Sequence, residues 1–298
     1  MTIKFLFSTG LILLLHFSLQ AQDSLHYRVL RFSSSHTSFP DTGRVNGHVG
    51  SGVFYSRAGH YDDSSVLVVV PRGWRPGKET DLVFWFHGWH NNIDTALRFY
   101  ALARQFAAAR RNAVLVLAET AKDAADSYGG KMQQKGMFRQ LVSDVLGELE
   151  RSGAAAGAVK ARHILLAGHS GAYQVIADIL QNGQMPVDEV FLFDALYARV
   201  DTYLDWIAGS DGHHFVHWYT NHGGGTDEMS DTLMHRLVTR RIGYGTAEES
   251  TLGTEILRSE RVLFVHSPRE HNVIINEPDD FQLLLENSSC LAPGGMDR

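Results

Sequence analysis

Short, strongly apolar runs alternate with amphipathic stretches along most of this chain. A run that is apolar at nearly every position and too short for a helix is typical of a strand buried on both faces of a parallel sheet. We expect such strands at residues 81–86, 113–118, 163–167, 190–193, 214–220 and 261–266, with two leading strands at 47–56 and 65–70.

Helical patterns separate these runs. Between residues 138 and 149 the apolar positions follow i, i+3, i+4, i+7 spacing, which predicts an amphipathic helix that covers one face of a sheet. Further helices are expected at residues 94–111, 199–208 and 232–241. This alternation predicts an α/β protein with a doubly wound, mostly parallel sheet and helices on both faces.

The N-terminus has the pattern of a signal peptide. Lys4 precedes an apolar stretch at residues 5–19, and a cleavage site follows at Ala21. The stretch is short for a bilayer span of about 20 residues. We therefore expect residues 1–21 to be removed on export, leaving a periplasmic or secreted protein with no stable membrane anchor.

The composition limits the number of domains and the kinds of partner that this protein can have. With 298 residues, 44% of them hydrophobic, and no internal repeat or long linker, residues 22–298 are expected to form a single α/β domain. The formal net charge of -6 and the absence of a basic run argue against a nucleic-acid partner. The single cysteine, Cys290, cannot form an internal disulfide.

The most informative motif is Gly168-His169-Ser170-Gly171-Ala172, which follows an apolar strand and opens a helical pattern. A serine on such a sharp turn, with small residues two before it and one and two after it, has the layout of a nucleophile elbow. Bulky neighbours would collide with the strand and the helix. The last position is alanine here rather than the usual glycine, and the small methyl group of alanine can still fit at this turn.

A second motif supports the first. The apolar strand at 81–86 ends in His87-Gly88, one strand follows at 113–118, and the next carries Ser170. With both motifs at this separation, the chain resembles the α/β-hydrolase superfamily, without a large cap domain because the connection at 195–212 is short. The resemblance implies an exported serine hydrolase with Ser170 as nucleophile and an oxyanion hole made by the backbone N–H groups of Trp89 and Gly171.

The resemblance also implies the order Ser, acid, His along the chain, with the histidine just after the last core strand. His271 lies in the loop that follows the strand at 261–266, so it is the expected general base, and His266 at the strand end is the alternative. For the acid, Asp194 at the end of a buried apolar strand is favoured over Asp227, whose position suits the start of a helix.

A metal enzyme and a non-catalytic binding protein are the two alternative classes of protein. The histidines suggest a metal enzyme, but His213 and His217 would lie about 13 Å apart along a strand, too far to share one ion. We therefore expect no metal and no cofactor. A non-catalytic binding relative would be expected to lack part of the triad, whereas every role here has a candidate.

The substrate is expected to be a carboxylic ester, or alternatively an amide or peptide, of a large or polymeric molecule. The pocket should be shaped by the loops at 120–136 and 223–260. Asp126, Tyr128 and Lys131 in the first loop are the candidates for contact with substrate.

Overall fold

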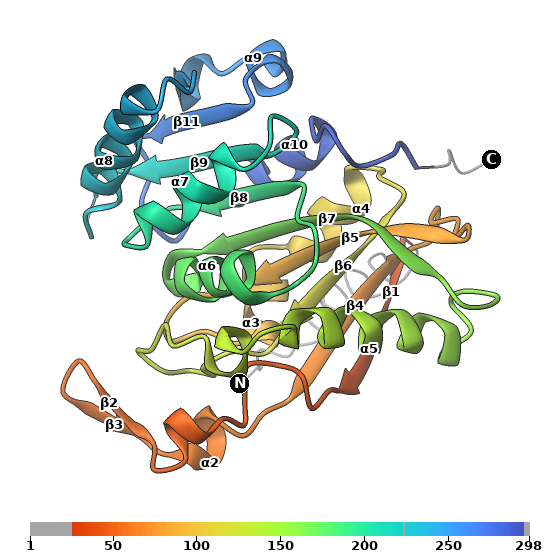
Figure 1. The fold of residues 1–298 in the computed structure, drawn as a ribbon. Coiled ribbons are helices and arrows are strands. Elements are labelled where there is room, and N and C mark those ends of the chain that lie inside the picture. The colour runs from red at the N-terminus through yellow and green to blue at the C-terminus, as the bar shows by residue number, and fades with distance from the viewer. Residues whose placement is uncertain (1–25, 223, 295–298) are drawn as a thin grey trace, which may run out of the picture.

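The computed structural model describes residues 26–222 and 224–294, so the expected signal peptide at 1–21 lies outside the described residues. A mixed sheet forms the centre of this part of the chain (Figure 1). Its nine strands are, in chain order, β1 (Tyr27–Ser33), β4 (Ser65–Pro71), β5 (Glu79–Phe86), β6 (Ala113–Ala118), β7 (Lys160–His169), β8 (Glu189–Phe193), β9 (His214–Thr220), β10 (Gly245–Glu248) and β11 (Val262–Ser267).

The order of strands across the sheet is β1-β4-β6-β5-β7-β8-β9-β11-β10. Strand β4 runs antiparallel to both of its neighbours, and every other pair in the sheet is parallel. From β5 the chain winds outward to β6, and from β7 it winds outward in the opposite direction. The carboxyl ends of β5 and β7 therefore meet at a topological switch point, the usual place for a site in such a sheet.

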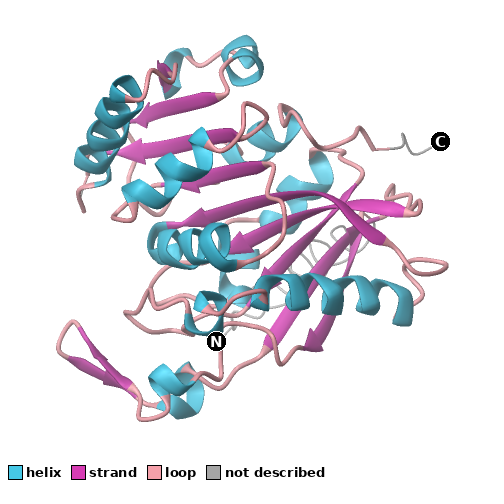
Figure 2. Ribbon diagram, viewed as in Figure 1, coloured by secondary structure: helices cyan, strands magenta, loops and turns pink. Residues whose placement is uncertain are grey.

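Helices cover both faces of the sheet (Figure 2). On one face lie α5 (Met137–Arg151), α6 (Tyr173–Asn182), α7 (Val200–Ala208) and α8 (Thr226–Thr239), which share a core with the side chains of that face. On the other face lie α3 (Ile93–Phe99), α4 (Leu102–Ala108), α9 (Thr254–Ser259) and α10 (Asp280–Glu286). The predicted doubly wound architecture is confirmed.

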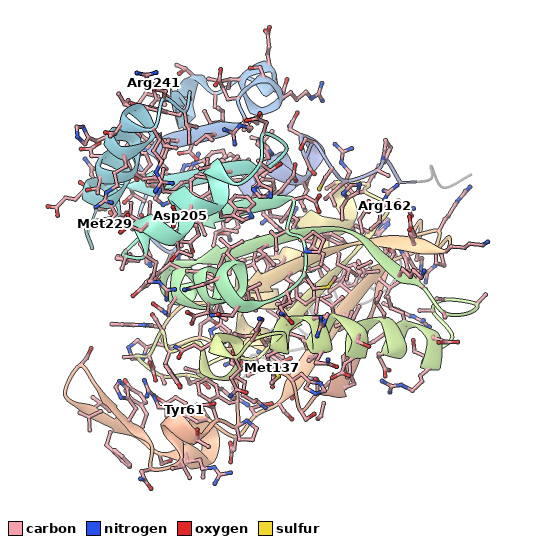
Figure 3. The ribbon with its side chains drawn as sticks, in the orientation of Figure 1. Tyr61, Met137, Arg162, Asp205, Met229 and Arg241 are labelled. Atoms are coloured by element: carbon pink, nitrogen blue, oxygen red, sulfur yellow. The ribbon has the colours of Figure 1, made fainter. Side chains whose placement is uncertain are left out.

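The buried carboxylate of Asp81, at the opposite end of the sheet from Ser170, is paired with an arginine. Asp81 on β5 is fully buried, and Arg162 near the start of β7 donates to it from Nε at 2.7 Å and from a terminal nitrogen at 2.5 Å. Figure 3 shows Arg162 at the edge of the molecule. This bidentate pair lies at the amino end of β7, at the opposite end of that strand from Ser170.

The first strand of the sheet differs from the prediction. Residues 47–56 do not join the main sheet but form the separate hairpin β2 (His48–Gly50) and β3 (Val53–Tyr55), beyond which lies the short α2 (Arg57–His60). The hairpin turns at Ser51 and Gly52, whose φ angles are 48° and 78°. The leading strand is instead β1, which the hydrophobic pattern missed because most of its side chains are partly or fully exposed.

The long helix expected at 94–111 is also interrupted. It is divided into α3 and α4 at Tyr100 and Ala101, where the φ of Ala101 is 49°. The helix expected at 232–241 begins earlier, at Thr226. The connection from β8 to β9 carries only α7, so the expected absence of a large cap holds. Within the described ranges, no helix combines the length and the apolar character needed to cross a membrane.

Candidate active site

Ser170 lies on a sharp turn between β7 and α6. It begins the short 3-10 helix η3 (Ser170–Ala172), and its φ is +56°, a value that non-glycine residues adopt at a cost. Only glycine fits two residues earlier. A Cβ on Gly168 would lie 2.6 Å from the Ala172 Cβ and 3.2 Å from the Phe86 carbonyl oxygen. The space left by Gly168 is therefore what accommodates the alanine that departs from the usual elbow pattern.

Asp194 and His271 meet beside this turn. Asp194 follows β8 directly, is completely buried and has a φ of 44°. His271 lies in the irregular segment after β11, and its Nδ1 donates to Asp194 Oδ2 at 2.5 Å. The second carboxylate oxygen accepts from the Thr220 backbone N–H at 3.2 Å and from the Thr226 hydroxyl. The carboxylate thus accepts three hydrogen bonds, from residues 26, 32 and 77 positions away in the sequence.

These contacts keep the carboxylate ionised. Burial alone would raise the pKa of Asp194, but the hydrogen bonds from His271 and Thr226 and the charge of His271 outweigh it, and the pKa lies below its ordinary value. An ionised Asp194 fixes the His271 tautomer with the proton on Nδ1, which leaves Nε2 free to accept a proton.

The alternatives to these two residues lie elsewhere. His266 Nδ1 donates to Glu248 on the edge strand β10 at 2.9 Å. Asp227 lies in the first turn of α8, where a carboxylate suits the helix dipole. Its neighbour Thr226 is the residue that reaches Asp194, and the sequence interpretation missed it.

The loop after β5 packs against the elbow, backbone to backbone. A Cβ on Gly88 would lie 2.5 Å from Ser170 Cβ and 3.0 Å from the Gly171 nitrogen. A Cβ on Gly171 would lie 2.7 Å from Trp89 Cδ1. Gly171 is in the first turn of η3, where N–H groups have no acceptor within the helix. The two predicted oxyanion-hole residues, Trp89 and Gly171, are therefore neighbours in space.

A buried ion pair holds this loop. His87 Nε2 donates to Glu119 Oε1 at 2.6 Å, and His87 Nδ1 donates to the Gly88 carbonyl oxygen at 2.8 Å. Burial would lower the pKa of His87, but the hydrogen bond and charge of Glu119 raise it above its ordinary value, so the ring donates from both nitrogens. The sequence interpretation missed Glu119, although its position directly after the apolar strand β6 is a signal that could have identified it.

No family model matches this chain, and no curated protein matches its sequence. Solved structures do match: a feruloyl esterase module from Clostridium thermocellum aligns with a TM-score of 0.54 and 10% identity, over 92% of each chain. This chain has the α/β-hydrolase fold.

Two further structures support the same conclusion about the fold. An S-formylglutathione hydrolase from Staphylococcus aureus aligns with a TM-score of 0.52 and 11% identity, over 87% of this chain and 96% of that one. The enterobactin hydrolase IroE aligns with a TM-score of 0.50 and 12% identity, over 91% of this chain and 100% of that one. At such identities the likeness establishes the fold, and the residue assignments depend on the geometry of this chain itself.

Tyr197 is a further side chain at the site that sequence reasoning missed. Its ring lies edge-on to His271, with 6.4 Å between centroids, and 6.0 Å from the ring of Tyr173. Burial and the charge of Asp194 raise its pKa, while the side chain of Ser170 acts in the opposite direction. The phenol therefore stays protonated and can donate a hydrogen bond beside Ser170.

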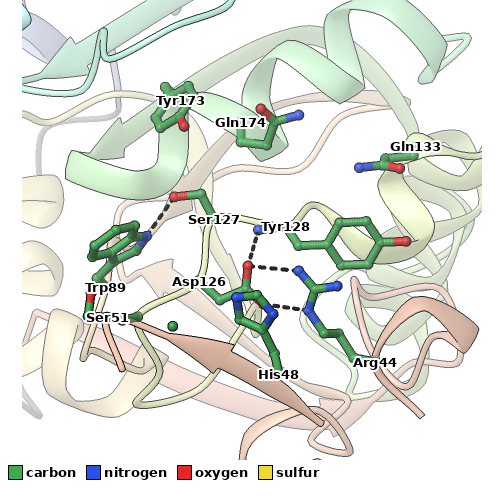
Figure 4. Close-up of a pocket in the computed structure, with 12 residues that line it drawn as sticks. Arg44, His48, Ser51, Trp89, Asp126, Ser127, Tyr128, Gln133, Tyr173 and Gln174 are labelled. Carbon is green, nitrogen blue, oxygen red and sulfur yellow. Dashed lines mark hydrogen bonds and ion pairs between the residues drawn. The ribbon is translucent and has the colours of Figure 1, made fainter. Parts of the chain in front are cut away.

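A cavity of about 480 Å³ opens next to the elbow (Figure 4). The lining residues are Arg44, His48, Gly50, Ser51, Trp89, Ala125, Asp126, Ser127, Tyr128, Gln133, Tyr173 and Gln174. Arg44 donates to both oxygens of Asp126, at 2.6 and 3.1 Å, and lies 4.2 Å from the Tyr128 ring centre. The Trp89 indole N–H donates to Ser127 Oγ at 2.7 Å. The wall is thus aromatic and polar, and the Arg44 charge is paired.

The residues that line the cavity agree only in part with the loops that the sequence predicted to shape the pocket. Asp126 and Tyr128 line it, whereas Lys131 donates to the Ser35 carbonyl oxygen instead. The opposite wall comes from residues 44–51, including the β2–β3 hairpin, whereas the sequence interpretation assigned that role to residues 223–260. The strand pattern at 47–56 was assigned to the main sheet, so it gave no reason to expect these residues at the cavity.

The conspicuous histidines at residues 213 and 217, just before β9 and within it, have separate partners. His213 stacks on Trp206 with 4.4 Å between ring centroids, and His217 is buried with its Nδ1 3.0 Å from Ser230 Oγ. Across residues 26–222 and 224–294, no group of three or more His, Cys, Asp or Glu side chains is placed to hold a metal ion.

Proposed function

We propose that this protein is a serine hydrolase that cleaves a carboxylic ester through an acyl-enzyme, with Ser170, His271 and Asp194 as the catalytic triad. The observation that carries the proposal is the 2.5 Å contact between His271 and the buried Asp194, beside a serine held at a positive φ on the strand–helix turn. A nucleophile needs a base, and the base needs a group that orients it.

In the proposed reaction, His271 Nε2 takes the proton of Ser170 Oγ while Oγ attacks the carbonyl carbon. The oxygen of the resulting tetrahedral intermediate accepts hydrogen bonds from the N–H groups of Trp89 and Gly171, each worth about 3 kcal/mol. Collapse breaks the ester bond, and His271 returns the proton to the departing alcohol. Water then repeats the sequence on the acyl-enzyme and releases the acid. Asp194 stabilises the imidazolium in both halves.

The choice of an ester follows the descriptions of the fold relatives, among them a feruloyl esterase and an S-formylglutathione hydrolase. Amide or peptide cleavage by the same three residues is the alternative, since the acyl-transfer chemistry is shared. The exposed Trp89 and the open, uncapped cavity favour an ester of a large or polymeric molecule over a small, enclosed one.

The decisive experiment is labelling with a fluorophosphonate probe followed by peptide mapping. We expect modification at Ser170, loss of labelling in Ser170→Ala, and full labelling in the control Ser152→Ala, whose serine follows α5 far from the elbow. Labelling at another residue with Ser170 untouched would refute the assignment. A panel of acyl chain-length esters, acetylated sugars and peptide amides then separates esterase from amidase.

We also propose that the protein is exported and cleaved after Ala21, on the basis of the charged and apolar pattern of residues 1–19. Mass spectrometry of the protein from its host should find an N-terminus near Gln22. An intact N-terminus in a soluble cytoplasmic fraction would contradict export.

A further inference from the structure

His169, the residue before the nucleophile, has both ring nitrogens engaged. It ends β7 and is almost completely buried. Its Nε2 lies 2.9 Å from the backbone carbonyl oxygen of His271, and its Nδ1 lies 3.0 Å from the hydroxyl of Tyr100. The first contact joins residues 102 positions apart in the sequence.

These partners determine the tautomer. A carbonyl oxygen can only accept, so Nε2 of His169 must carry the proton and donate to His271. Nδ1 is then an acceptor, and the Tyr100 hydroxyl donates to it. Tyr100 is itself buried at the end of α3, where its ring lies 5.3 Å from that of His169. Tyr100 thus selects the form of His169 that can bind the His271 carbonyl oxygen.

His169 also stays uncharged. Burial, followed by the charge of His271, lowers its pKa to about 3. Its ring lies 4.4 Å from the ring of His271, centroid to centroid, at an angle of 36°. A second cation at that distance would oppose the imidazolium that forms on His271 during acyl transfer, and a neutral ring does not.

The backbone of His271 gains an anchor that it otherwise lacks. It lies in an irregular segment between β11 and α10, so no sheet or helix hydrogen bond fixes its carbonyl group. Asp194 holds the side chain at Nδ1, and His169 holds the main chain of the same residue. Two contacts on different parts of one residue fix both the position and the direction of its ring.

We propose that Tyr100 and His169 form a positioning pair that holds the base His271 at the correct distance from Ser170 and does not itself touch substrate. The proposal rests on the proposed function, because it presupposes that His271 is the base. Its consequence is that the pair affects kcat and leaves substrate binding nearly unchanged.

Three variants test it. His169→Phe keeps a ring of similar size but removes both hydrogen bonds, and we expect kcat to fall by about 100-fold, as for a displacement of a catalytic group by about 1 Å. KM should change by less than about threefold. His169→Gln retains an amide donor near the Nε2 position and should recover part of kcat. Tyr100→Phe removes only the hydroxyl and should lower kcat by about five- to tenfold.

The matched control is His217→Phe. His217 is an equally buried histidine whose pKa burial also lowers to about 3, but its ring lies against Ser230, Tyr219 and Phe264 and makes no contact with His271. Its kcat should equal that of the wild type. Wild-type kcat in His169→Phe, or a loss confined to KM, would overturn the proposal, as would His169→Gln no more active than His169→Phe.

A crystal structure of His169→Phe gives an answer that does not depend on activity. We expect the backbone at His271 to move by about 1 Å and its contact with Asp194 to lengthen. An unmoved His271 would refute the positioning role. Absence of ester hydrolysis in the wild type, by contrast, would refute the proposed function, and the displacement of His271 in the variant crystal would still decide the positioning role.

Discussion

Replacing Asp194 with asparagine tests the triad through a specific hydrogen-bond conflict. Asp194 Oδ1 accepts from the Thr220 N–H and the Thr226 hydroxyl, while Oδ2 accepts from His271. Asparagine has a single acceptor oxygen. The Thr220 N–H can only donate, so that oxygen takes the Oδ1 position and the amide NH2 group faces His271 Nδ1.

This arrangement forces the wrong tautomer on His271, the proposed base. His271 must then accept at Nδ1, which places its proton on Nε2, where it can no longer take the proton of Ser170. The same substitution in the serine-protease triad, the example that defines this effect, lowers kcat by about 10⁴. A comparable loss is expected here, equivalent to about 5.5 kcal/mol of transition-state stabilisation.

The assay is kcat on the best ester from the substrate panel, with circular dichroism and thermal denaturation to confirm folding. Asparagine tolerates the φ of 44° at this position, so the fold should persist. Asp227→Asn is the matched control and should alter only stability, by about 0.3–1 kcal/mol. If Asp227→Asn is the inactive variant while Asp194→Asn turns over normally, the tautomer argument fails and the acid belongs to α8.

Three further substitutions probe the surroundings of the site. Glu119→Gln should reduce the free energy of unfolding by about 1–3 kcal/mol. The stability advantage of the wild type over this variant is fully present below the ordinary histidine pKa of 6.5 and should shrink as pH rises through the raised pKa of His87. Denaturant titrations in which the advantage grows with pH would contradict this. Asp280→Asn should raise Tm at pH 7–8. Burial and the nearby Glu249 raise the pKa of Asp280 to about 9, so the folded wild type loses stability as pH rises from about 4 to that value. An unchanged Tm would show that ionising Asp280 does not destabilise the fold. Gly168→Ala should cost about 1–3 kcal/mol by crowding Ala172, and Ala172→Gly added to it should restore part of the loss in thermal denaturation; no recovery would place the strain elsewhere.

The strands that could be predicted from the sequence are those with two buried faces. β6, for example, is buried at every position, so its apolar run is continuous and its boundaries match the prediction. β1 could not be found in this way, because it is an edge strand whose side chains are mostly exposed or half-buried. The break between α3 and α4 was equally hidden, since Tyr100 and Ala101 fit the helical pattern and only the αL backbone of Ala101 ends it.

Some residues of the candidate site could likewise be recognised from the pattern of buried strands, and others could not. Asp194 and Glu119 are carboxylates that directly follow an apolar strand, where an unpaired charge would be expensive, so the pattern itself draws attention to them. Thr226 and Tyr197 carry no such signal. Their positions at the site depend on how distant segments pack, as in the contact between Thr226 and Asp194, 32 residues apart.

The switch point between β5 and β7 explains why the polar contacts of this protein concentrate where they do. Three backbone segments must converge on Ser170: the loop after β5, the elbow, and the segment of His271. Each of them leaves the sheet close to the point of convergence, and each is tied there by a buried polar side chain, namely His87, His169 and Asp194. Fixed dipoles aid acyl transfer because they need no reorganisation when charge develops. Weakening any of these ties should therefore reduce kcat more than substrate affinity, and a variant at His87 or His169 that raised KM alone would show that these buried contacts serve substrate binding and not the placement of the reacting groups.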